Sequence, residues 1–343
     1  MNQLRTLSPA LAGDKSRLSK QARNKIQALS GARPREFLIQ AGGAWGIIIA
    51  VIVLAIHINN IWMTALAIPI IATRFNILGL LVHEQVHQLG LRGRYGDTLA
   101  NILTAYPIGI TVEDYAKVHL SHHKYYFTED DPDFLRKSGP DWTFPIPTPH
   151  LIKLLLSDLC GLSFYRILQG KRLENKQIYK RLHPTPKWLR PAFYIGLAVL
   201  LTYFELWPVF LIYWLLPLMT FTPLIVRLGA ICEHVYNLPQ AGVIESSPLI
   251  ILSWWEKLIL PNLNFTLHAY HHFFPGIAHC NLPKVHEIFK RENLVNEEAV
   301  FHSYSAYLRY LQTTHTRNTS HISLKTAVED VQRSRNAGRL TRL

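Results

Sequence analysis

The sequence predicts an all-α integral membrane protein with four transmembrane helices in two hairpins and a helical cap on the cytoplasmic side. Three observations support this prediction: long apolar blocks that are almost free of charge, short connections within each pair of blocks, and basic residues concentrated in the remaining segments. Hydrophobic residues make up 49% of the 343 residues and charged residues 17%. The position of the apolar residues, rather than their amount, therefore decides the fold class.

The first hairpin is predicted at residues 37–56 and 61–82. The block 37–56 (FLIQAGGAWGIIIAVIVLAI) contains no charged residue. At a rise of 1.5 Å per residue, a helix of this length crosses a hydrocarbon core of about 30 Å. The block 61–82 carries one charge, Arg74, and follows after residues 57–60 only. Such a short connection predicts two antiparallel neighbouring helices.

The second hairpin is predicted at residues 191–207 and 209–226, which are apolar runs separated near Pro208. Two further apolar segments, 98–110 and 248–262, are shorter or interrupted. Because they are too short to cross a bilayer, we expect them at the membrane interface or half-buried.

The basic residues are distributed by topology. The net charge is +13, and 34 of the 36 Lys and Arg residues fall in residues 1–36, 88–190 and 228–343. Four spans place these three segments on one side of the membrane. The positive-inside rule then predicts a multi-pass protein with cytoplasmic termini, and attraction to anionic lipid accounts for the excess positive charge. This distribution argues against nucleic acid as a partner.

Three regions follow from these features. Residues 1–36 are a basic cytoplasmic segment without the pattern of a signal peptide, and 37–290 form the membrane domain. Residues 291–343 are expected to hold a C-terminal helix and a basic, partly disordered tail. The three cysteines form no CxxC pair, so neither a disulfide framework nor an iron–sulfur site is predicted.

Histidines carry the chemical signal of this sequence. Of seventeen histidines, eight lie in three short clusters, HEQVH, HLSHH and HAYHH, and a ninth stands alone in ICEHV. Within each cluster the spacing i, i+3 or i+4 places the imidazoles on one helical face. The nine are His83, His87, His119, His122, His123, His234, His268, His271 and His272.

This number of imidazoles predicts two metal ions. Neutral imidazole suits iron, zinc and copper, and eight or nine rings are too many for one tetrahedral ion. Two ions of higher coordination with open positions suit dioxygen activation at non-haem iron. Zinc does not perform this redox chemistry.

A zinc protease and a transporter or metal store explain less of this histidine pattern. HEQVH alone also matches the HExxH of zinc proteases, in which Glu84 would be the general base, but two additional HxxHH clusters have no role there. A transporter or metal store would need polar residues along its spans, and these spans have few. His234 taken alone is better explained as an ordinary solvated or hydrogen-bonded histidine near a helix end than as a ligand.

The sequence resembles the membrane fatty-acid desaturase and hydroxylase superfamily over roughly residues 40–290. The resemblance lies in the HxxxH, HxxHH and HxxHH boxes after membrane segments, in DDPDF at Asp130–Phe134, and in Phe274-Pro275 after the third box. It implies a helical cap on a four-helix stem, with two irons at their junction. It implies that the eight box histidines are iron ligands and that His234 is an additional one.

Carboxylates and carbonyls near these histidines are expected to orient the rings, because a ligating imidazole usually donates its other N–H to such a group. The candidates are Glu84, Asp131, Asp133, Glu233 and Asn264.

The resemblance also implies the reaction class. It implies a dioxygen-dependent oxidoreductase that desaturates a fatty acyl or lipid chain. The alternatives are a hydroxylase or ketolase of a lipid or carotenoid, and a desaturase of an amino-acid-derived metabolite of the rhizobitoxine type. Ala230 replaces an asparagine of acyl-CoA desaturases, and no HPGG haem segment occurs. Electrons are therefore expected from a separate ferredoxin or cytochrome b5 type donor with its reductase.

Overall fold

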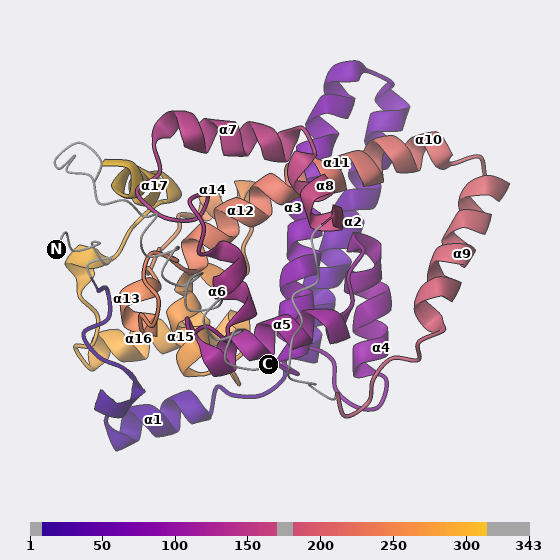
Figure 1. The fold of residues 1–343 in the computed structure, drawn as a ribbon. Coiled ribbons are helices and arrows are strands. Elements are labelled where there is room, and N and C mark those ends of the chain that lie inside the picture. Colours follow the sequence, from indigo (N-terminus) through magenta and orange to yellow (C-terminus); the bar gives the residue numbers. More distant parts are fainter. Residues whose placement is uncertain (1–8, 170–180, 314–343) are drawn as a thin grey trace, which may run out of the picture.

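The computed structural model describes residues 9–169 and 181–313, and within these residues the chain is helical with no β-strand (Figure 1). Three isolated β-bridges connect distant loops, at Leu11–Val295, Gly31–Ile277 and Ile250–Phe301. The α-helices are α1 (Lys20–Gln27), α2 (Pro34–Ile58), α3 (Ile61–Val86), α4 (Gly96–Ala100), α5 (Val112–Tyr125), α6 (Pro132–Lys137), α7 (Thr148–Leu159), α8 (Leu162–Gln169), α9 (Leu189–Tyr203), α10 (Trp207–Phe210), α11 (Leu216–Met219), α12 (Phe221–Glu233), α13 (Val243–Ser246), α14 (Trp254–Ile259), α15 (His268–Phe273), α16 (Leu282–Arg291) and α17 (Tyr304–Thr313). Shorter π or 3₁₀ segments are η1 (Lys15–Arg17), η2 (Asn101–Ala105), η3 (Tyr106–Ile108), η4 (Leu211–Leu215), η5 (Phe265–Leu267), η6 (His279–Asn281) and η7 (Glu297–Ala299).

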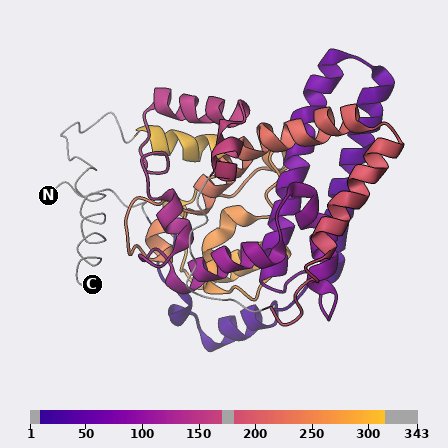
Figure 2. The same ribbon diagram turned by 45° about the vertical axis from the view of Figure 1, so that its right-hand side comes forward.

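Helices α2 and α3 form the predicted first hairpin and lie side by side (Figures 1 and 2). Pro34 begins α2. Proline is tolerated at this position because the N–H that it lacks would have no acceptor within the helix. Asn59 ends α2 in the left-handed conformation with φ 48°, and the side chain of Asn60 accepts a hydrogen bond from the Trp62 N–H. Two consecutive asparagines therefore make the turn, because asparagine tolerates the left-handed conformation that ends a helix and also serves as the N-cap that begins one.

The apolar surface of this hairpin faces outward as well as inward. In α2 the buried residues follow one stripe and include Phe37, Ala41 and Ile48, whereas Val53 is 60% exposed. Mean hydropathy is 2.3 for α2 and 1.9 for α3. Helices that are apolar on all sides belong in a membrane.

The second predicted hairpin differs in its bounds. Residues 207–233, comprising α10, η4, α11 and α12, form a third apolar run long enough to cross a bilayer, with a mean hydropathy of 2.1. Its partner α9 has 15 residues, fewer than the roughly 20 that a span needs. The described chain thus contains three helices of spanning length and one shorter apolar helix.

The third run is irregular because of its prolines. Pro217 has no N–H to bond the carbonyl one turn earlier, and the π-helical segment η4 precedes it. Thr220 then departs from helical geometry, with φ −114° and ψ −80°, before α12 begins. In both views this run crosses the α2–α3 hairpin at a steep angle (Figures 1 and 2).

The two segments expected at the interface or half-buried differ from each other. Residues 98–110 form parts of α4, η2 and η3, and Tyr106 within them is only 2% exposed. Residues 248–262 contain α14, where Trp254 is 78% exposed.

The cap packs beside the end of α3. The N-terminal helix α1 and the helices α15 and α16 share a hydrophobic core that contains Ile26, Tyr270 and Phe289. The expected C-terminal helix corresponds to α17, and the tail after residue 313 lies outside the described residues. The core of the cap therefore joins the N-terminal segment to the third histidine cluster and to α16.

Candidate metal centre

The nine predicted ligands come from four elements. His83 lies in the last turn of α3 and His87 is its C-cap; the HLSHH histidines lie in α5; His234 is the C-cap of α12; and the HAYHH histidines lie in α15. Helix α5 starts at Thr111, whose side chain accepts a hydrogen bond from the Asp114 N–H.

The loop before α15 turns the third cluster toward the others. Leu263 and Asn264 adopt φ 49° and 61°, a left-handed conformation that is uncommon for leucine. The Asn262 side chain accepts a hydrogen bond from the Asn264 N–H, which stabilises this turn. The cluster that begins at His268 follows directly after the short segment η5.

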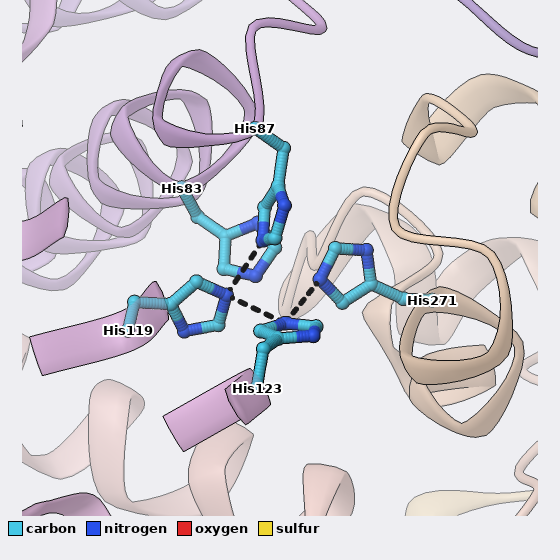
Figure 3. Close-up of side chains that lie close together, drawn as sticks. All are labelled: His83, His87, His119, His123 and His271. Carbon is cyan, nitrogen blue, oxygen red and sulfur yellow. Dashed lines mark hydrogen bonds between the residues drawn. The ribbon is translucent and has the colours of Figure 1, made fainter. Parts of the chain in front are cut away.

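Five of the nine histidines form the first group. Their ring nitrogens converge from α3, α5 and α15, and one nitrogen from each lies within 4.8 Å of the others (Figure 3). The Nε2 atoms of His87 and His119 are 2.8 Å apart, those of His119 and His123 are 3.0 Å apart, and those of His123 and His271 are 3.0 Å apart. The group consists of His83, His87, His119, His123 and His271.

Three further histidines form the second group. Nε2 of His234 lies 3.2 Å from Nε2 of His122 and 3.0 Å from Nε2 of His272. His268 is in neither group, but its ring centroid is 4.7 Å from that of His234 and 4.8 Å from that of His272. His268 therefore borders the second group. The rings of His123 and His272 stack at 4.2 Å, so the two groups are neighbours.

The donor set fits metal cations. Lone pairs on adjacent Nε2 atoms repel at about 3 Å unless a proton or a cation lies between them. Both ring nitrogens of His83 and the Nδ1 atoms of His268 and His271 are buried without a hydrogen-bond partner. Buried polar atoms normally have a partner, so these rings are arranged for a ligand that the chain itself does not supply.

The protonation state also fits metal binding. Burial, followed by the charge of Arg181, lowers the pKa of His87 to about 3. Burial and the neighbouring histidines hold the pKa values of His119 and His271 well below 6.5. The same causes apply to His123, His234, His268 and His272. These rings are neutral at pH 7, which is the form that binds metals.

Asp131 is the predicted orienting carboxylate that contacts a histidine of the two groups. Its Oδ2 accepts a hydrogen bond from His122 Nδ1 at 2.8 Å and from the Phe127 N–H at 2.9 Å. Its Oδ1 accepts from the N–H groups of Asp133 and Phe134, at the start of α6. Donation from Nδ1 leaves the lone pair of His122 on Nε2, which points into the second group.

Replacement of Asp131 by Asn tests this role. We expect activity and metal affinity to fall by about 10- to 100-fold, because the amide weakens the hold on the His122 tautomer. Bound metal per chain and the rate of turnover should be measured together. Asp141→Asn, in a surface pair with His150, is the matched control. Unchanged metal content and activity in Asp131→Asn would contradict the assignment.

The other orienting candidates contact different groups. Glu84 Oε2 accepts from the N–H and from Nδ1 of His279, both at 3.1 Å. Asp133 Oδ2 accepts from Lys137 at 2.8 Å and from the Tyr236 hydroxyl at 2.9 Å. The remaining two are Asn264, whose Nδ2 donates to the His279 carbonyl at 3.3 Å, and Glu233, which is half-buried beside His234.

Three residues at the centre were not predicted from the sequence. His234 Nδ1 lies 2.9 Å from the Ser247 hydroxyl and 3.1 Å from the Tyr126 hydroxyl. His279 is buried against Glu84 and lies outside every histidine cluster. No local pattern marks these residues, because Ser247 follows α13, 13 residues after His234, and His279 lies in η6, 195 residues from Glu84. Tyr126 directly follows α5, and this closeness to the second histidine cluster is the one feature of the sequence that could have indicated its role.

A buried polar network fixes the last turn of α3. The Gln85 side chain donates to the Leu91 carbonyl and to Asp97, and accepts from the Leu91 N–H. Arg181 donates to both carboxylate oxygens of Asp97 and to the carbonyls of Gln85 and Val86. These bonds satisfy carbonyls that a helix end leaves free, so the two histidines of α3 are held at a rigid terminus.

Comparison with known proteins agrees with this geometry. The family model "Fatty acid desaturase" matches residues 59–305, which is more than two thirds of the chain and includes all nine histidines. No match is found among curated proteins. Together with three apolar helices of spanning length, the match identifies a membrane oxidoreductase. The chain belongs to the fatty acid desaturase family.

Proposed function

We propose that the protein is a dioxygen-dependent di-iron oxidoreductase that desaturates a fatty acyl or lipid chain. The observation that carries the proposal is the pair of neighbouring groups in which imidazole Nε2 atoms converge. Eight histidines of these groups, together with His268 at their border, would hold two iron ions. Such ions supply the capacity to use dioxygen and external electrons to oxidise an unactivated C–H bond.

The residues of the chain keep the two groups in a ligating state. Asp131 holds the proton of His122 on Nδ1, and Ser247 and Tyr126 meet Nδ1 of His234. In both rings Nε2 is thereby directed into the second group. The buried surroundings exclude water, which favours hydrogen removal from a held substrate over side reactions.

The reaction balances with a separate electron donor. Desaturation removes two hydrogen atoms from the substrate, which carry two protons and two electrons, and two further electrons and two protons complete the reduction of one dioxygen to two waters. A ferredoxin or cytochrome b5 type protein with its reductase would supply the two electrons. Hydroxylation uses the same inputs but transfers one oxygen to the substrate, so hydroxylase or ketolase activity on a lipid or carotenoid is the alternative. A second alternative is the desaturation of an amino-acid-derived metabolite.

We also propose the membrane orientation. With α9 as a fourth, shorter span, the basic segments and the metal centre lie on the cytoplasmic side, where anionic lipid attracts them. The irregular run from α10 to α12 would complete the second hairpin.

The position of Glu84 argues against a zinc protease. Its carboxylate accepts two hydrogen bonds from His279, whereas a protease base must face a metal-bound water. We expect Glu84→Gln to lower C–H oxidation by about 10- to 100-fold without abolishing it, because the amide oxygen still accepts one of these bonds. Product formation and bound metal are the measurements. Complete loss of turnover in a variant that retains its metals would contradict a positioning role.

The experiment that tests the function compares metabolites. Lipid and polar extracts are analysed by mass spectrometry from cells that express the intact protein or His271→Ala, with an electron-donor system present. Loss of two hydrogens from a lipid supports acyl desaturation. An added oxygen supports the hydroxylase alternative. A change confined to a polar metabolite supports desaturation of an amino-acid-derived metabolite. Identical extracts would overturn the proposal.

A further inference from the structure

An open groove lies between the α2–α3 hairpin and the segment that leads from α14 to the third histidine cluster. Its volume is about 380 Å³. One wall is the start of α2, another is the middle of α3, and the third is the loop before η5. The lining residues are Ile39, Gln40, Gly43, Ala44, Ile47, Arg74, Ile77, Lys257, Pro261, Asn262, Leu263 and Asn264.

Two cations face this groove. Arg74 is the one charged residue of the predicted span 61–82, and its side chain is half-buried. Its Nε donates to the Thr73 hydroxyl at 3.1 Å. Within the described residues no carboxylate pairs with Arg74 or with Lys257. A cation inside a membrane segment is costly unless a partner balances it, so the pair marks a site for an anion.

One side of the groove has the features of a helix at the membrane–water boundary. Helix α14 carries Lys257 and exposes Trp254, Trp255 and Leu258 by 78%, 50% and 69%. Exposed tryptophans beside a lysine are typical of a helix at the membrane–water boundary. Gln40 and Gly43 belong to the first turns of α2, which begins at Pro34. The α14 side of the groove, which carries Lys257, therefore has the character of the membrane–water boundary.

We propose that this groove binds the phosphate of a membrane phospholipid. Arg74 of α3 and Lys257 of α14 supply two positive charges to the groove, and guanidinium and ammonium groups are the usual phosphate partners. Gly43 leaves the α2 wall open, because a Cβ atom there would meet nothing within 4 Å. Ile39, Ile47 and Ile77 give the rest of the groove an apolar lining for the glycerol and the upper acyl chains.

The loop before η5 connects the groove to the metal centre. Leu263 and Asn264 line the groove and precede Phe265, whose ring packs against that of His83 with centroids 4.5 Å apart. A lipid bound there would fix the cap against the membrane beside the ligands. This proposal concerns lipid binding and does not depend on the reaction that the metals perform.

The test is lipid retention measured by native mass spectrometry on the full-length protein in detergent. We expect phosphatidylglycerol to remain bound to the intact protein and to bind on the order of tenfold more weakly to Arg74→Gln/Lys257→Gln. Arg35→Gln, which removes an exposed charge at the start of α2, is the matched control and should bind normally. Equal retention by the double variant and the intact protein would overturn the proposal. So would full displacement by millimolar inorganic phosphate, or equal retention of palmitate, since these would assign the site to free phosphate or to a carboxylate.

A second measurement uses the unmodified sequence, so it does not depend on the folding of a variant. Phosphatidylglycerol with a photoreactive diazirine near its glycerol is irradiated with the protein in vesicles of phosphatidylcholine. Labelling concentrated in peptides that contain residues 39–47 and 257–264 supports the site. Labelling spread evenly over the apolar helices would overturn it.

Discussion

Replacement of His271 by Ala should remove metal from the five-histidine group and reduce turnover by more than about 100-fold. His271 Nε2 lies 3.0 Å from His123 Nε2, and the imidazole converges with rings from α3 and α5. Loss of a ligand is expected to cost more than loss of an orienting partner, for which 10- to 100-fold is usual. Membrane insertion should remain intact, because His271 lies in α15, outside the spanning helices.

The neighbouring residue gives a paired experiment. His272 belongs to the other group, so His272→Ala should deplete that group, and each single variant should retain about half of the iron of the intact protein. Iron per chain is measured by elemental analysis, with His302→Ala at an exposed position as the control. Full iron content and full activity in either His271→Ala or His272→Ala would show that the ligand assignment is wrong.

The helical class and the family could be predicted from the sequence because both depend on local patterns. The apolar blocks at 37–56 and 61–82 correspond to α2 and α3, since hydropathy and length determine a span almost independently of the rest of the chain. The HxxHH spacing likewise places rings on one helical face whatever surrounds the helix. The resemblance to desaturases rested on these patterns, and the family match confirms it.

The second pair of helices was less predictable. The expected break near Pro208 lies at the start of the third apolar run, because proline is tolerated at the beginning of a helix. Pro217 interrupts the same run, yet the π-helical segment before it keeps the chain helical. Hydropathy alone does not distinguish a proline that begins a helix from one that ends it. The end of α9 at Tyr203 left that helix shorter than predicted.

The surroundings of the metal centre depend on contacts between distant segments. Asp131 follows the second box closely, and its bond to His122 spans nine residues, so the sequence indicated it. The Glu84–His279 contact spans 195 residues and no local pattern predicts it. The Tyr126 hydroxyl lies 3.1 Å from His234 Nδ1, a contact that spans 108 residues and that only the fold reveals.

Acidification should destabilise the metal-free protein and release the metals. The pKa of His87 is about 3 and that of His119 lies well below 6.5, in both cases first because of burial. An unfolded chain protonates these histidines near pH 6.5, so between about pH 6.5 and 3 the unfolded state binds more protons. The free energy of unfolding must therefore fall as the pH falls through this window, and it should change little above about pH 7.5.

The size of the effect follows from the same linkage. Each such histidine contributes about 1.4 kcal/mol per pH unit in that window, so several together make the fold steeply sensitive to acid. The measurements are thermal unfolding of the metal-free protein in detergent and iron per chain of the loaded protein, from pH 8 to 4. Protons compete with iron for the same Nε2 lone pairs, so iron should leave over the acidic part of this range and return on neutralisation. A stability that stays constant between pH 7.5 and 5 would contradict the burial of these neutral imidazoles, whereas iron that stays bound would show only that the metals outcompete protons.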